Sequence, residues 1–99
     1  AQDLLETLAT HRTRVDERLA AATANWELDR LGAVDRTLLR LGAAEILFWR
    51  WIPDEVTIDE YVEIAKKFGT EKSGGFVNGI LDRIARDAGD PESRPEGVT

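Results

Sequence analysis

The segment from Ala33 to about Trp49 constrains the fold most, because it is apolar on most sides of a helix. Its apolar residues are Val34, Leu38, Leu39, Leu41, Ala43, Ile46, Leu47 and Phe48. A helix that is apolar over most of its circumference needs other elements packed around it. Pro53 disfavours helical structure at the residue before it, so the segment ends there. We therefore expect a central helix that the rest of the chain covers.

Amphipathic helices are expected on both sides of this segment. From Asp3 to about Ala22, spacings of three and four place one stripe on a helix: Leu4, Leu8, His11, Val15, Leu19 and Ala22. A third helix is expected to begin at Thr57, because Glu60 three positions on would complete a capping box. It ends before Gly69, a residue that suits the left-handed conformation after a helix end.

A fourth helix is expected to begin near Ser73. Its apolar residues fall on one arc of about 140° at about 100° per residue: Phe76, Val77, Ile80, Leu81, Ile84 and Ala88. The pairs Asp82–Arg86 and Arg83–Asp87 have the spacing of ion pairs on its solvent side. Beyond Gly89 the chain has two prolines and little apolar surface to bury. Residues 89–99 are therefore predicted to be a disordered tail.

These patterns predict an all-α fold, a compact bundle of about four main helices in one domain over residues 1–88. A short helical turn anchored by Trp26 would link the first two helices, and Trp26 is expected to be structural. With 99 residues, 42% of them hydrophobic, the chain can form one core. No strand-like alternation extends beyond a few residues.

Composition excludes several classes of function. The chain has no cysteine and one histidine, which rules out a disulfide framework, a thiolate nucleophile and a histidine-based metal cluster within one chain. We expect no metal and no cofactor. No apolar run approaches the roughly 20 residues that span a bilayer, and no signal peptide is evident, so a cytoplasmic protein without a membrane partner is expected. The net charge of -6 means that any RNA contact must be local.

Two titratable residues fall on apolar faces. Glu45 lies among Val34, Leu38, Leu41 and Phe48 on the helical wheel. A structural acceptor for backbone N–H groups, a tryptophan or an arginine is favoured over an acid catalyst, because no second convergent group is evident. His11 could act as a base or pH switch, but it is interpreted as structural. No catalytic residue is predicted.

The sequence GTEKSGG from Gly69 to Gly75 superficially resembles a phosphate-binding loop. No glycine precedes Lys72–Ser73 directly and no strand leads into the segment, which argues against a nucleotide-binding P-loop. Free amides at a helix N-terminus beside Lys72 could receive one RNA phosphate. A plain helix start with glycines that allow a tight entry is an equally good interpretation.

Two surface features suggest protein contacts. FWRWIP at Phe48 to Pro53 places Trp49 and Trp51 at a helix end, a composition typical of interfaces and also able to stack on bases. Homodimerisation through the Trp49–Trp51 region is one possibility. Glu27, Asp29 and Asp35 form an acidic cluster, either a solvated face or a dock for a basic partner.

Three stretches follow one another in order: NWELDRLGAVDRTLLRLGAAEIL at Asn25 to Leu47, IPDEVTIDEYVEIAKKFG at Ile52 to Gly69, and EKSGGFVNGILDRIA at Glu71 to Ala85. Together they resemble the NusB family of transcription antitermination factors. The resemblance covers roughly Asp3 to Ala85 and corresponds to the C-terminal part of the family fold. It implies an all-helical, non-enzymatic protein that binds boxA RNA of ribosomal RNA leaders with the small-subunit ribosomal protein NusE, within an antitermination complex with RNA polymerase.

The resemblance also assigns roles to individual positions. Phe76 would stack on a base, Lys72 would lie near phosphate, and Asn78 sits at the polar boundary of the same helix. Asp35 corresponds to an acidic position on the NusE-facing side, and Glu45 matches a structural glutamate of the central helix. The Arg-rich N-terminal helix that supplies many RNA contacts in the family is absent from this sequence.

An alternative is the NusB-like RNA-targeting domain of a ribosomal RNA cytosine methyltransferase. Gly79 in FVNGIL favours the free factor, because the fused form commonly has alanine at the corresponding position. A third possibility is a helical fragment that dimerises through Trp49 and Trp51 without an activity of its own.

Overall fold

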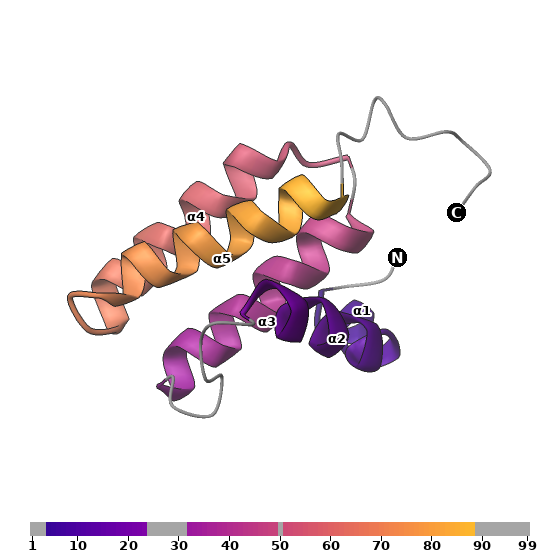
Figure 1. Cartoon of the computed structure of the whole chain (residues 1–99), viewed down its shortest axis with the longest axis horizontal. Coiled ribbons are helices and arrows are strands. Elements are labelled where there is room, and N and C mark those ends of the chain that lie inside the picture. The colour runs from indigo at the N-terminus through magenta and orange to yellow at the C-terminus, as the bar shows by residue number, and fades with distance from the viewer. Residues whose placement is uncertain (1–3, 24–31, 50, 89–99) are drawn as a thin grey trace.

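A computed structural model describes residues 4–23, 32–49 and 51–88, and these form five helices (Figure 1). They are α1 (Leu4–Thr10), α2 (Arg12–Ala22), α3 (Ala33–Phe48), α4 (Asp54–Phe68) and α5 (Ser73–Ala88). No strand occurs in these ranges, which confirms the predicted all-α fold. The predicted turn at Trp26 and the predicted tail over 89–99 lie outside the described residues. Within the described part of the chain, every helix is too short or too polar to cross a membrane.

The helix α3 is central, as its apolar circumference predicts. It packs against α1 and α2 on one side and against α4 and α5 on the other, and α4 and α5 lie side by side (Figure 1). Leu39, Ala43 and Ile46 of α3 are almost completely buried, and they meet Leu81 and Ile84 of α5 in the same core. The two helical pairs are therefore joined mainly through α3, and α2 also contacts α5 directly. Burial of the apolar surface of α3 is the main force that holds the pairs together.

The first predicted helix is divided at His11. The backbone there has φ -113° and ψ 22°, so α1 ends at Thr10 and α2 begins at Arg12. The His11 ring stacks on Phe48 of α3, with 4.0 Å between ring centroids and 13° between planes. The break thus coincides with a contact between His11 and a residue of α3. A helical wheel of one segment cannot show such a contact. The apolar stripe itself is confirmed, because Val15 and Leu19 are fully buried.

The third helix begins earlier than predicted, and the capping box at Thr57 is wrong. Pro53 with φ -58° is the N-cap, and Asp54 and Glu55 lie in the first turn, where carboxylates are favourable near the helix dipole. Thr57 is therefore inside α4, where it is 1% exposed. Its hydroxyl faces the core and is not available to a helix terminus.

The turn between α4 and α5 does not use a left-handed glycine. Gly69 has φ -97° and ψ -159°, which is extended backbone open to any residue. Glycine is required here by space, because a Cβ would overlap the Ser73 side chain. The predicted helix end is correct, but close packing is the reason for the glycine.

Candidate nucleic-acid interface

The start of α5 is fixed by reciprocal contacts between Thr70 and Ser73. The Thr70 N–H donates to Ser73 Oγ over 2.8 Å, and the Ser73 N–H donates to the Thr70 carbonyl over 3.0 Å. The Lys72 N–H donates to Thr70 Oγ1 over 3.3 Å. Two amides at this helix entry are thus satisfied by side chains. The contacts hold the first turn of α5, and with it Lys72, in place.

A groove of about 810 Å³ runs along α5 beside the C-terminal end of α2. Ala21 and Ala22, which have small side chains, line it on the α2 side. Three cationic residues line the α5 side: Lys72, Arg83 and Arg86. Among the described residues that line it, Glu71 is the one acid. On a chain of net charge -6, the described residues that line the groove thus include more basic than acidic side chains.

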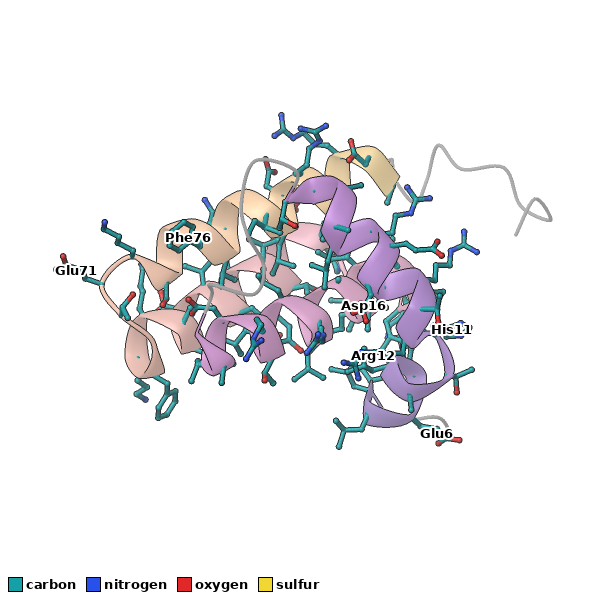
Figure 2. The ribbon with its side chains drawn as sticks, turned by 60° about the horizontal axis from the view of Figure 1, so that its bottom comes forward. Glu6, His11, Arg12, Asp16, Glu71 and Phe76 are labelled. Atoms are coloured by element: carbon teal, nitrogen blue, oxygen red, sulfur yellow. The ribbon has the colours of Figure 1, made fainter. Side chains whose placement is uncertain are left out.

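The middle of the groove combines an aromatic ring with an open helix face. Phe76 is half-buried there, at the same end of the molecule as Glu71 (Figure 2). Gly75 and Gly79 flank it, and a Cβ at either glycine would meet nothing within 4 Å. A flat ligand could therefore approach the α5 backbone closely beside an aromatic face, between positive charges. This combination suits a single-stranded nucleic acid, which binds through base stacking and phosphate contacts.

The structure brings together two of the three residues predicted to contact RNA. Lys72 and Phe76 are four residues apart and both line the groove. Asn78 is exposed but is not part of the groove lining, because two residues turn a helix by about 200° from Phe76. An RNA role for Asn78 stays a prediction that this geometry does not favour.

The predicted partner-binding residues are mostly outside the described chain. Glu27 and Asp29 belong to residues 24–31, as does Trp26. Asp35 lies in the first turn of α3 and is 6% exposed, and its Oδ1 has no hydrogen-bond partner within the described part of the chain. A buried carboxylate oxygen without a partner is costly. Asp35 is thus less accessible than the solvated cluster in the sequence interpretation.

From their spacing alone, Arg83 and Arg86 are expected only in ion pairs on the solvent side of the helix. Those pairs are confirmed: Arg83 Nε lies 3.1 Å from Asp87 Oδ2, and Arg86 Nη2 lies 3.1 Å from Asp82 Oδ2. The same arginines also line the groove. The signal was present, because positions 72, 76, 79, 83 and 86 recur at three and four and share one helix face. The sequence does not reveal that the end of α2 lies beside this face and makes it one side of a groove.

Glu45 is held in a buried polar cluster away from the groove. Tyr61 Oη donates to Glu45 Oε2 over 2.6 Å, and Thr57 Oγ1 donates to Oε1 at 3.5 Å. The donors are hydroxyls of α4 and not the amides, tryptophan or arginine considered from sequence. Burial, and then the hydrogen bond to Glu45, raises the pKa of Tyr61 well above its usual value of 10.0. The cluster ties α3 to α4.

His11, whose ring stacks on Phe48 at the end of α3, lies at the end of the molecule opposite Phe76 (Figure 2). Two tryptophans follow Phe48 closely in the chain. Trp49 and Trp51 stack with 5.3 Å between ring centroids, and Trp49 Nε1 donates to Thr7 Oγ1 over 3.2 Å. Trp49 is thus tied to α1, whereas Trp51 is 72% exposed. The Trp49–Trp51 surface and the groove are separate candidate binding surfaces.

Comparison with known proteins supports one family. The NusB family model matches residues 1–86. A protein of Methylacidiphilum infernorum named "Transcription antitermination protein NusB" is 49% identical over 85 residues, which are 86% of this chain and 59% of that protein. A Thermotoga maritima protein with the same name is 56% identical over 73 residues, or 74% of this chain and 51% of the relative.

A solved structure agrees with these matches. The structure of T. maritima NusB superimposes with a TM-score of 0.83 and 47% sequence identity, covering 90% of this chain and 63% of that one. The chain thus spans less than two thirds of these relatives. Because the family model matches most of the chain and the helices follow the same arrangement, this protein belongs to the NusB family.

Proposed function

We propose that this protein is a non-enzymatic transcription antitermination factor that binds boxA-type RNA of ribosomal RNA leaders together with the ribosomal protein NusE, in a complex with RNA polymerase. The observation that carries the proposal is the groove in which Phe76 lies between Lys72 and two arginines. The names of the relatives favour the free factor over the targeting domain of a methyltransferase.

The RNA contact follows from the shape and charge of the groove. Phe76 offers a ring for base stacking, and Lys72 is exposed four residues before it on the same face. Stacking recognises any base, and a lysine ammonium supplies a point charge for phosphate. The groove therefore suits an unpaired strand, since the bases of a duplex are already stacked on each other.

The NusE contact is proposed for the beginning of α3. Gly32, Ala33 and Val34 are exposed there, and Asp35 follows them with one buried oxygen that has no partner within the described part of the chain. A basic side chain of the partner that reached Asp35 would supply the missing donor. We expect Asp35→Asn to weaken NusE binding while RNA binding by the groove stays unchanged.

Affinity for a boxA-type RNA oligonucleotide tests the proposal. Fluorescence anisotropy would compare the wild type with Phe76→Ala and Lys72→Ala over a series of stated salt concentrations. Loss of a base stack costs about 1–3 kcal/mol. Phe76→Ala should therefore weaken binding between roughly fivefold and more than a hundredfold. Lys72→Ala should also flatten the salt dependence of the affinity by about 0.7, as expected for one lost phosphate contact.

Matched controls come from α4. Phe68→Ala removes an aromatic ring that is 67% exposed, and Lys67→Ala removes an exposed lysine, both outside the groove lining. The proposal requires that these variants bind as the wild type does. Equal losses of RNA affinity in Phe68→Ala and Phe76→Ala would refute the assignment of the groove. Unchanged RNA affinity in both Phe76→Ala and Lys72→Ala would refute it as well.

A further inference from the structure

Arg83 and Arg86 extend the positive side of the groove well beyond Phe76. They lie 11 and 14 residues after Lys72, which corresponds to roughly 16 and 21 Å along a helix that rises 1.5 Å per residue. This length exceeds a single stacked base. A strand held at Phe76 and running along α5 would pass both arginines.

Each arginine is already paired with a carboxylate on its own helix. Arg83 Nε lies 3.2 and 3.1 Å from the two carboxylate oxygens of Asp87, and the Arg83 side chain is 58% exposed. The Arg86 side chain, paired with Asp82, is 71% exposed. Exposed pairs of this spacing are weak, because water screens both charges. A phosphate can therefore replace the carboxylate with little loss.

Arginine is the residue best suited to make that exchange. Its planar guanidinium group can donate two parallel hydrogen bonds to a phosphate, as it does to a carboxylate. Asp87 takes Arg83 Nε and Asp82 takes Arg86 Nη2, so each aspartate occupies one of the guanidinium nitrogens that a bidentate phosphate would use. The carboxylates thus orient the arginines in the free protein and compete with RNA for them.

We propose that Arg83 and Arg86 form a second phosphate-binding arm of the groove, and that Asp87 and Asp82 hold this arm until an RNA strand displaces them. The ligand class is the phosphate backbone of single-stranded RNA, which rests on the function proposed above. The arm would lengthen the strand that the protein contacts, and the two aspartates would set how tightly the strand is held.

The test compares RNA affinity and its salt dependence across charge variants of α5. Arg83→Gln/Arg86→Gln should weaken binding of a boxA-type oligonucleotide roughly tenfold. The slope of log affinity against log salt should flatten by about 1.4, since each phosphate contact on a single strand contributes about 0.7. The control Arg12→Gln/Arg14→Gln removes the same charge at the start of α2, and Arg12 lies at the far end of the molecule from Phe76 (Figure 2).

The aspartates give the opposite prediction. Asp82→Asn/Asp87→Asn should tighten RNA binding severalfold, and by more than Asp59→Asn/Glu63→Gln, which removes two exposed acids of α4. Tightening equal to that of the control, or weaker binding, would overturn the displacement step. Such a result would mean that the aspartates do not compete with the RNA.

The outcomes separate this inference from the proposed function. One outcome is that Phe76→Ala weakens RNA binding while Arg83→Gln/Arg86→Gln binds RNA as its α2 control does. In that case the second phosphate-binding arm is wrong, and the assignment of the groove stands. Should the wild type not bind RNA at all, the proposed function fails first. Circular dichroism of each variant verifies that the helices are intact.

Discussion

Gly79→Ala should stabilise the protein, because the fold gives no reason for glycine at that position. Gly79 lies in the interior of α5, and a Cβ there would meet nothing within 4 Å. Alanine is favoured over glycine in a helix interior by about 0.8–1.0 kcal/mol, and no steric cost offsets this gain. For a chain of this size, a gain of that order raises the melting temperature by roughly 4–8 °C.

Gly42→Ala is the matched comparison, for which we expect a loss of stability. Gly42 also lies inside a helix, but a Cβ there would be 2.7 Å from Leu81 Cδ1, and Leu81 is fully buried. Overpacking a core costs typically about 1–3 kcal/mol, which exceeds the gain in helix propensity. Gly42→Ala should therefore destabilise the protein although the chemical change is the same.

Urea denaturation followed by circular dichroism measures both variants. A urea midpoint that Gly79→Ala fails to raise, or that Gly42→Ala raises, would refute the roles given to these two glycines. RNA binding supplies a second readout, because Gly79 lines the groove beside Phe76. A methyl group there narrows the groove, so Gly79→Ala should bind RNA more weakly while being more stable.

Two further predictions concern the core and the exposed tryptophan. Tyr61 is the single tyrosine of the chain, and its pKa is raised above 10.0, so the stability it contributes is complete below about pH 10 and is lost as the pH rises further. Phenolate absorbance should therefore appear only as the helical signal is lost, and a phenolate that titrates near pH 10 in the folded protein would contradict this. We also propose self-association through Trp49 and Trp51: sedimentation at several concentrations should show a dimer that Trp51→Ser weakens, and a monomeric wild type would exclude it.

Local patterns predicted much of the fold. The bounds of α3 and α5 follow from apolar periodicity and from Pro53, and the central place of α3 follows from its apolar circumference. The break at His11 could not be predicted, because it coincides with a stack on Phe48, a residue distant in sequence. The start of α4 was misplaced because Thr57 and Glu60 fit a capping box, whereas the structure uses Thr57 inside the core.

The candidate site was only partly predictable. Lys72 and Phe76 share a helix face at a spacing that sequence alone reveals. The contribution of Arg83 and Arg86 depends on where the end of α2 lies, and that is set by tertiary packing. The hydroxyl donors of the buried Glu45 likewise come from a neighbouring helix, which no helical wheel of α3 contains.

Amide chemical shifts test the central claim most directly, since they locate RNA on the protein without a mutation. Titration of the isotope-labelled chain with a boxA-type oligonucleotide should shift the amides of Gly75, Phe76 and Gly79 most, with smaller changes along α4. Shifts concentrated instead at His11 and Trp51, or no shifts at RNA concentrations that saturate anisotropy, would contradict the assignment of the groove between α2 and α5.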